Sequence, residues 1–256
     1  MKNMHLKIAN KILSVFYYYE ETYDICIDFI VDSVKPDIII TITKEELDSL
    51  IMEETSTLIP KQTDFEKSMA VMLNYNSYES HLLLKKIADA LLSYGILLIH
   101  GAAITVDKKC YIFTAPSGVG KTTHILNWIK AVPGVSIVNG DKPFLDILNY
   151  KVYSSPWCGK EGLGENISAH LSGIVYLERC IENRIEPVSL KEILPILFQQ
   201  IYIPRNRELA IKAFQLFDRF RAVSFYHLFC NMDTQSALVS YKGLIDGKGT
   251  LGSACK

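Results

Sequence analysis

One short segment of the chain has the residue types and spacing of a phosphate-binding loop. It fits the pattern G-x-x-x-x-G-K-[ST], with alanine in place of the first glycine, and reads Ala115-Pro116-Ser117-Gly118-Val119-Gly120-Lys121-Thr122-Thr123. Gly118 and Gly120 let backbone N–H groups approach phosphate oxygens, because a glycine has no Cβ in the way. Lys121 can neutralise the β- and γ-phosphates, and the Thr122 hydroxyl can ligate Mg²⁺. We therefore predict that residues 117–123 bind a nucleotide.

The elements on either side of this loop support the prediction. The segment KCYIFTA (109–115) predicts a strand immediately before the loop, and an amphipathic helix is expected from Lys121. Backbone N–H groups and the positive end of the helix dipole would then meet where phosphates sit. The competing interpretation is an ordinary glycine turn that caps a helix.

An acidic residue in reach of the loop would complete a magnesium site. Asp141 follows the apolar segment VSIVNG (135–140) and lies 20 residues beyond Lys121, which allows one helix and one returning strand. We expect Asp141 to hold or position the metal together with Thr122. A solvated aspartate in a turn at the end of a strand is the alternative.

A histidine and a charged pair could take part in a reaction at this loop. His100 precedes the strand and turn that lead to the loop, and a lone histidine in an apolar segment is either a hydrogen-bonded core residue or an acid–base group. Lys160 and Glu161 lie in a glycine-flanked segment, a common place for groups that contact a substrate. A solvated surface loop is the alternative for that pair.

Together these residues resemble the kinase domain of HPr kinase/phosphorylase and, more distantly, ATP-type phosphoenolpyruvate carboxykinase. The resemblance covers residues 95–180 and rests on His100-Gly101, the 21 residues from His100 to Lys121, the SGVGKT loop and Asn139-Gly140-Asp141. The segment PWCGKEG (156–162) is similar to a broad bacterial set of HPr-kinase-like proteins, some of which serve peptide-modifying gene clusters.

The resemblance implies ATP-dependent phosphoryl transfer and assigns roles by position. Lys121 and Thr122 match the phosphate and magnesium residues, and His100 matches the histidine near the transferred phosphate. Asp141 matches the second of two adjacent aspartates that handle the metal and the proton, while Gly140 stands where the first would be. The arginine-bearing segment used for protein dephosphorylation and the residues that act on oxaloacetate are not recognisable, so neither reaction is expected.

The predicted fold is α/β, with a mixed β-sheet phosphate-loop kinase core of the HPr kinase and carboxykinase type. Residues 6–18 and 37–43 predict strands with a helix between them, and the polar segment 53–65 follows. We therefore divide the chain into a small N-terminal α/β unit, residues 1–75, and a phosphate-loop domain, residues 76–256. A hairpin-like pairing of 96–106 with 109–115 is expected to lead into the loop.

Composition and charge limit which partners and which cellular location we expect for the protein. Lys and Arg number 27 against 28 Asp and Glu, so no broad basic field favours nucleic acid or an anionic membrane. No apolar run approaches the length of a membrane span, and the start of the chain lacks the features of a signal peptide. The six cysteines lie far apart, without zinc-site spacing. These features predict a cytoplasmic protein, and a homo-oligomer is compatible with them.

We expect an ATP- and Mg²⁺-dependent kinase that phosphorylates a hydroxyl, most plausibly a serine of a peptide or protein, or a small metabolite. Asp141 and His100 are both candidates for the base that takes the hydroxyl proton. A nucleotide-sensing or peptide-binding protein that performs no transfer is one alternative, favoured by Gly140. A hydrolysing switch is another, although the sequence has no N-K-x-D tetrapeptide for guanine. ATP, another nucleotide and pyrophosphate all remain open as donors.

Overall fold

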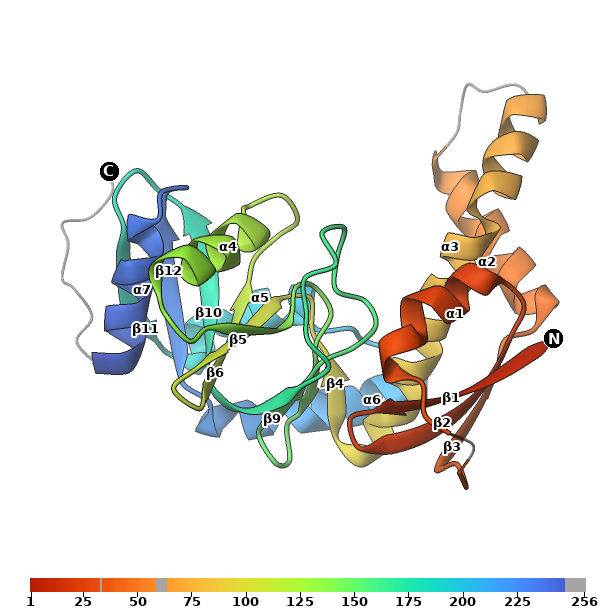
Figure 1. Cartoon of the computed structure of the whole chain (residues 1–256), viewed down its shortest axis with the longest axis horizontal. Helices are drawn as coiled ribbons and strands as arrows, with labels where there is room; N and C mark the ends of the chain where they lie inside the picture. The colour runs from red at the N-terminus through yellow and green to blue at the C-terminus, as the bar shows by residue number, and fades with distance from the viewer. Residues whose placement is uncertain (33, 59–63, 247–256) are drawn as a thin grey trace. The chain divides into compact units, whose positions relative to one another are not determined.

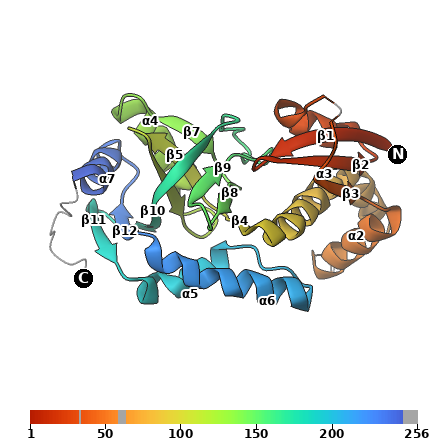
Figure 2. The same cartoon turned by 90° about the horizontal axis from the view of Figure 1, so that it is seen from below.

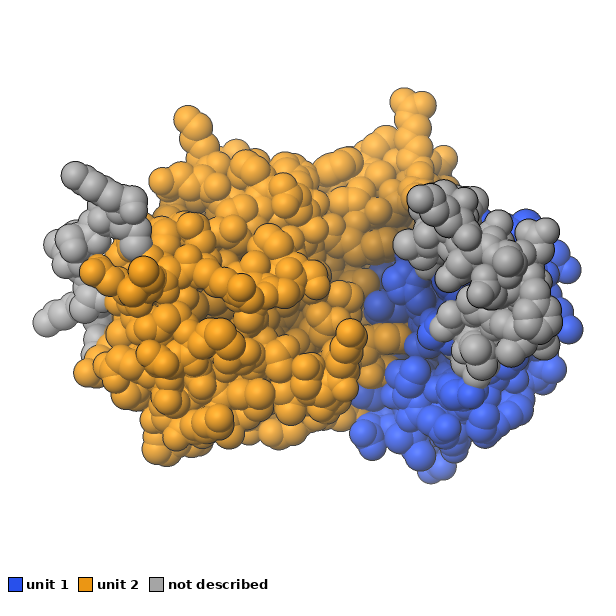
Figure 3. All heavy atoms as spheres, turned by 90° about the horizontal axis from the view of Figure 1, so that it is seen from above, with its two compact units in different colours: residues 1–90 blue, residues 91–256 orange. Residues whose placement is uncertain are grey.

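The computed structural model describes residues 1–32, 34–58 and 64–246 of the chain. It is a mixed α/β structure, which confirms the predicted class (Figure 1). The chain divides into two compact units, residues 1–90 and 91–256 (Figure 3). The sequence division at residue 75 falls inside a continuous helix, α3 (Asp64–Leu91). Within the described residues, no helix combines the length and apolarity that a bilayer span needs.

The N-terminal unit is built on a three-stranded sheet. A hairpin of β1 (Lys2–Ile8) and β2 (Lys11–Tyr17) turns at Ala9 and Asn10, which both have positive φ, and β3 (Ile38–Thr41) pairs parallel to β2. The predicted single strand over 6–18 is therefore parts of two strands, because Asn10 tolerates the left-handed conformation that a two-residue turn requires. The helical elements of this unit are α1 (Glu20–Cys26), η1 (Ile27–Phe29), α2 (Lys44–Leu58) and α3.

The C-terminal unit contains a nine-stranded mixed sheet. Its main path has the order β4-β8-β9-β10-β6-β5-β7, and β12 pairs with both β10 and β11. The turn at Asp107 and Lys108, both at positive φ, joins β5 to β6, as the predicted hairpin requires. The strands are β4 (Ile96–Leu98), β5 (Ala102–Val106), β6 (Lys109–Thr114), β7 (Ser136–Asn139), β8 (Phe144–Asp146), β9 (Lys151–Tyr153), β10 (Ser168–Arg179), β11 (Arg184–Val188) and β12 (Phe225–Cys230).

The strand directions bring several chain segments to one edge of this sheet. β10 is parallel to both β6 and β12, and β5 is antiparallel to both β6 and β7. The carboxyl ends of β6, β7, β10 and β12 therefore lie at the same edge, together with the amino end of β5. In α/β sheets, ligands bind outside this edge.

Helices cover both faces of the sheet (Figure 2). On one face, α4 (Lys121–Ala131) and α7 (Gln235–Asp246) pack over Phe113. On the other face, α5 (Leu190–Gln200), α6 (Arg207–Leu216) and η3 (Phe217–Ala222) pack over Ile112. Phe113 and Ile112 are adjacent and point to opposite faces, as the period of a β-strand requires. β6 is thus buried on both sides, which holds the loop after it in place.

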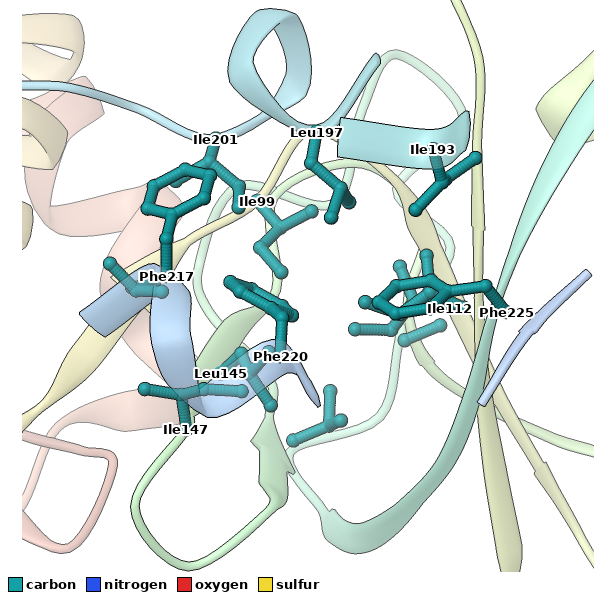
Figure 4. Close-up of a cluster of buried hydrophobic side chains, with 14 of the residues drawn as sticks. Ile99, Ile112, Leu145, Ile147, Ile193, Leu197, Ile201, Phe217, Phe220 and Phe225 are labelled. Atoms are coloured by element: carbon teal, nitrogen blue, oxygen red, sulfur yellow. The ribbon is translucent and has the colours of Figure 1, made fainter. Parts of the chain in front are cut away.

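The core beneath α5 and α6 is rich in phenylalanine. Figure 4 shows Phe217, Phe220 and Phe225 among aliphatic side chains from α5 and the sheet. The centroids of the Phe217 and Phe220 rings lie 5.5 Å apart, and those of Phe220 and Phe225 lie 6.4 Å apart. α5 begins at a capping box formed by Ser189 and Glu192, whose side chains accept hydrogen bonds from backbone N–H groups at the start of the helix.

Candidate functional site

A cavity of about 620 Å³ opens at the edge of the sheet where the four strands end. It is lined by the ends of β10 and β12, by the segments after β6, β7, β9 and β12, and by the segment before β5. Its size suits a small-molecule ligand. It brings together every site residue that the sequence analysis selected: His100, Ser117, Gly118, Val119, Gly120, Lys121, Thr122, Thr123, Asp141, Lys160 and Glu161.

The loop between β6 and α4 has the backbone conformation that its glycines predict. Gly118 has a φ of +78° and Gly120 a φ of +119°, in the left-handed region that favours glycine. Gly120 is also the N-cap of α4, and its carbonyl accepts the first helical hydrogen bond, from the His124 N–H at 2.9 Å. The first turn of α4 lines the cavity, so its free N–H groups and the positive end of the helix dipole lie next to the cavity.

Lys121 is a buried cation at the bottom of the loop. Its side chain donates from Nζ to the Ala115 carbonyl at 2.9 Å and to the Pro116 carbonyl at 3.5 Å. Burial lowers the pKa of Lys121, and the charge of Asp141 partly offsets this effect. An ammonium has three N–H donors, and burial makes an unbalanced charge costly. An anion in the cavity would therefore be stabilised by Lys121.

Asp141 lies between two basic side chains. Its Oδ1 is 3.3 Å from His100 Nε2, and its Oδ2 is 3.3 Å from Lys142 Nζ. Burial raises the pKa of Asp141, but the hydrogen bond from His100 and the charge of Lys142 outweigh burial and leave the pKa below its usual value. All three side chains are between 26% and 31% exposed, so they are accessible from the cavity. The group is an ionised carboxylate with a histidine on one oxygen and a lysine on the other.

A tight turn after β7 fixes the direction of Asp141 and Lys142. The Asn139 Oδ1 accepts hydrogen bonds from the backbone N–H of Asp141 at 2.8 Å and from that of Lys142 at 2.6 Å. Its amide group donates to the Ser155 carbonyl at 3.0 Å, which ties the turn to the segment after β9. Asn139 is fully buried, so these hydrogen bonds are protected from water.

The backbone also holds His100 in position. Its N–H donates to the Gln200 carbonyl at 2.7 Å, and its own carbonyl accepts from the Thr114 hydroxyl at 2.9 Å. The neighbouring Gly101 N–H donates to the Asp141 carbonyl at 2.9 Å. The His100–Asp141 contact is therefore supported by backbone hydrogen bonds on both sides.

Gly140 has a packing reason to be glycine. A Cβ at this position would lie 2.7 Å from the Cys158 carbonyl oxygen and 2.8 Å from the Leu163 carbonyl oxygen. Both contacts are with backbone, so no side-chain rotation could relieve them. The segment 158–163 thus fills the space that an aspartate at position 140 would need.

The same segment carries Lys160 and Glu161 to the cavity. Gly159, at a φ of +84°, lies so close to Asp141 that a Cβ on it would be 3.3 Å from the Asp141 Cβ. The segment therefore packs directly against the acid, as a substrate-contacting loop would. Lys160 and Glu161 are both exposed.

Lys142 and Arg179 are two further basic residues that line the cavity. Lys142 follows the predicted acid directly, but nothing local in the sequence shows that its side chain turns back to Asp141. Arg179, one of several arginines in the chain, donates from Nη2 to the Gly118 carbonyl and from Nε to the Val119 carbonyl, the latter at 2.9 Å. The signal for Arg179 is its position at the end of β10, the strand next to β6.

His124, in the first turn of α4, is a core residue. It is 2% exposed, and its Nε2 accepts a hydrogen bond from Trp128 Nε1 at 3.0 Å. The Ser236 and Ser240 hydroxyls are each 3.3 Å from one of its ring nitrogens. Burial lowers its pKa to about 3, so the ring is neutral.

Two side chains of the cavity, Thr122 and Asp141, have oxygen atoms that suit Mg²⁺. Both residues line the cavity, but the described part of the chain contains no group of three or more His, Cys, Asp or Glu arranged to bind a metal. Mg²⁺ commonly binds through one or two protein oxygens, substrate phosphates and water. The residues present fit that mode of binding.

No protein-family model matches the chain, and no curated protein is significantly similar to it. The cavity itself combines helix N–H groups and a buried cation for anions with a carboxylate–histidine pair for proton transfer. This combination suits a reaction in which a phosphate group is bound and a proton is removed nearby.

Proposed function

We propose that the chain is an ATP- and Mg²⁺-dependent kinase of the HPr kinase type, which transfers the γ-phosphoryl group to a hydroxyl. The observation that carries the proposal is that the phosphate-loop residues and the His100–Asp141 pair line one cavity. A phosphate loop alone binds nucleotides, whereas an adjacent acid–base pair is what transfer to a hydroxyl needs. The acceptor is a serine of a peptide or protein, or a small hydroxyl compound.

In the proposed reaction, the acceptor oxygen forms a bond to the γ-phosphorus while the bond from that phosphorus to the β–γ bridging oxygen breaks. The N–H groups of the loop and Lys121 stabilise the negative charge on the transferring group and on the departing ADP. The hydroxyl proton passes to the His100–Asp141 pair. We assign it to the pair because the His100 Nε2 and the Asp141 Oδ1 lie 3.3 Å apart, so both can be reached by the same proton.

Thr122 and Asp141 are the protein groups that would hold the metal. The ion would supply positive charge that partly neutralises the phosphates of the nucleotide. Asp141 meanwhile keeps His100 oriented through Oδ1, and Lys142 balances the charge on Oδ2. The site therefore uses one carboxylate where the HPr kinase pattern has two.

A protein that binds the nucleotide without transferring phosphate is the second candidate function. The missing aspartate at position 140 favours it, since one acid must then serve both the metal and the proton. In the structure Gly140 is required by packing, and Lys142 supplies a charge beside the remaining acid. These features are compatible with a rearranged catalytic site, which an activity measurement can distinguish from a sensor.

The experiment incubates the full chain with MgATP and a panel of serine peptides and small hydroxyl compounds. Mass spectrometry then reads the gain of one phosphoryl group on an acceptor. A kinase gives that gain, a sensor binds MgATP without it, and a hydrolysing switch releases phosphate without an acceptor. Either of the last two results contradicts the proposal.

Replacing Lys121 provides the matching control on the enzyme. We expect Lys121→Ala to lower the rate of transfer by about 100- to 1,000-fold, because the buried cation that we propose to stabilise the transferring phosphate is lost. Lys130→Ala alters an exposed lysine in the last turn of the same helix and should leave the rate unchanged. Thermal unfolding of both variants checks that the fold is intact. Transfer at the wild-type rate by a folded Lys121→Ala variant would exclude the proposed role of the loop.

A further inference from the structure

The side chains that line the cavity differ in polarity on the two sides of the phosphate loop, residues 117–123. One side is charged, with His100, Asp141, Lys142, Lys160 and Glu161. The other side comes from the ends of β10 and β12. The sheet order β12-β10-β6-β5-β7 puts β6, and so the loop that follows it, between the two groups. The residues of the second group are Leu177, Arg179, Cys230, Asn231 and Met232.

The two sides must receive different parts of a nucleotide. This step rests on the proposed function, in which the γ-phosphoryl group faces His100 and Asp141. With the phosphates on the loop, the α-phosphate, ribose and base extend in the opposite direction, towards the ends of β10 and β12. The side chains there would contact the base.

On this side, the Asn231 side chain and the Met232 carbonyl form hydrogen bonds with other parts of the protein. The Asn231 Oδ1 accepts from the Asp233 N–H at 3.0 Å and from the Asn183 amide at 3.1 Å, and its amide group donates to the Ile181 carbonyl at 3.1 Å. The Met232 carbonyl accepts from the Asn127 amide at 2.9 Å. These hydrogen bonds fix the segment beside α4 and occupy groups that could otherwise recognise the edge of a base.

The other side chains on this side of the cavity are apolar, or in the case of Arg179 have a flat guanidinium group. Met232 is 68% exposed beside the cavity, and Leu177 and Cys230 are buried beneath it. The guanidinium of Arg179 is held in place by the Gly118 and Val119 carbonyls. A thioether and a fixed guanidinium plane both pack well against the flat face of a purine.

We propose that this side of the cavity binds the nucleobase by apolar and stacking contacts with Met232 and Arg179, and discriminates little between adenine and guanine. Selection of one base over another by 10⁴-fold or more needs a site built to hydrogen-bond its edge, by the order of magnitude known for enzymes. Packing against a face gives affinity without that selection, because every purine has the same kind of face. The donor is therefore a purine nucleoside triphosphate of either type.

Calorimetric titration of the full chain tests this inference without an acceptor. The three ligands are MgATP, MgGTP and magnesium tripolyphosphate. We expect the Kd values of MgATP and MgGTP to agree within about threefold, and both to be about tenfold lower than that of tripolyphosphate, since base stacking adds affinity. Met232→Ala should raise the Kd of both nucleotides by the same factor and leave that of tripolyphosphate unchanged. Ile129→Ala, on an exposed residue of α4 that does not line the cavity, is the control.

The outcomes separate this inference from the proposed function. A preference of about 30-fold or more for one purine would exceed what face contacts give and would overturn the inference while leaving nucleotide binding intact. An unchanged nucleotide affinity in Met232→Ala would also overturn it. Failure of both MgATP and MgGTP to bind would overturn the inference and the proposed function together.

Discussion

Two histidines lie beside the phosphate loop, and their surroundings differ in almost every respect. His124 is 2% exposed, and Trp128 and two serine hydroxyls surround it; among the described residues, no acidic side chain contacts its ring nitrogens. His100 has a side chain that is 26% exposed, and its Nε2 is 3.3 Å from the carboxylate of Asp141. Both residues line the same cavity, so proximity to the loop does not distinguish them.

Burial and the nature of the hydrogen-bond partner distinguish an acid–base histidine from a core histidine. A ring whose pKa is lowered to about 3 by burial stays neutral at any physiological pH and cannot carry a proton away. A ring at the open edge of the sheet, next to an ionised carboxylate, can take a proton and be stabilised by the charge. We therefore assign His124 to the stability of the fold and His100 to the chemistry of the cavity.

The largest expected effect comes from the partner of His100. Asp141→Asn removes the charge that orients and stabilises the imidazole, so we expect the rate of transfer to fall by about 100- to 1,000-fold. The affinity for MgATP should change much less, because the loop and Lys121 remain. Single-turnover rates and calorimetric titration measure the two quantities separately.

Asp146→Asn is the control for this substitution. The Asp146 carboxylate accepts hydrogen bonds from the Leu148 and Asn149 backbone and from the Asn149 side chain, within the turn after β8. Its replacement should lower stability and leave the rate of transfer unchanged. An equal loss of nucleotide affinity and rate in Asp141→Asn would instead make Asp141 a binding residue.

A smaller effect is expected when the two histidines are exchanged for glutamine. His100→Gln should lower the rate of transfer by about 10- to 100-fold and leave the melting temperature nearly unchanged. His124→Gln should do the reverse and lower the free energy of unfolding by about 1–3 kcal/mol, because buried hydrogen bonds are lost. If His124→Gln lowered the rate more than His100→Gln, with the same fraction of each variant folded, the roles assigned to the two histidines would be wrong.

The last expected effect is a dependence of stability on pH to which His124 contributes. Its pKa is about 3 in the folded chain against an ordinary value of 6.5, so the unfolded state binds the proton first as the pH falls. Its contribution is present above pH 6.5 and is lost progressively between pH 6.5 and 3. From pH 7 to pH 5 this amounts to about 2 kcal/mol.

Fluorescence of Trp128, which donates to His124, reports this transition. The other tryptophan, Trp157, is replaced by phenylalanine in the background. Urea unfolding at pH 7 and pH 5 is compared between this background and the same chain with His124→Leu. The variant should lose about 2 kcal/mol less over this pH range, and an equal loss in both chains would contradict the assignment of His124.

The sequence predicts the loop and its supports well because their signals are local. Glycines at 118 and 120 followed by a lysine require one kind of turn, and a strand and a helix on either side are recognisable from composition. The turn at Asp107 and Lys108, which both have positive φ, is also a local feature. Each depends on a few adjacent residues, so each can be found without knowing the fold.

Other elements depend on their neighbours in space and were not predicted. β8 has only three residues, and β11 contains Pro187 between charged and apolar residues, so neither has a clear strand signature. β11 exists because it pairs with β12, far along the chain. α2 did have a local signal, the Thr43 and Glu46 capping box, which the sequence analysis overlooked.

The candidate site also contains some features that local sequence predicts and others that depend on distant residues. His100, Lys121 and Asp141 were selected from spacing and resemblance, and the structure brings them to one cavity. The reason for Gly140 was not visible, because the backbone that excludes a Cβ there comes from residues 158 and 163. Which histidine is buried could not be inferred either, since the serines around His124 come from α7, more than 100 residues later.

The most direct test of the central claim is a crystal structure of the full chain with Mg²⁺ and a non-hydrolysable ATP analogue. We predict that the phosphates lie on the N–H groups of residues 118–122, with the γ-phosphate in contact with Lys121 and facing His100 and Asp141. An analogue bound elsewhere, or one whose γ-phosphate faces away from Asp141, would contradict the account.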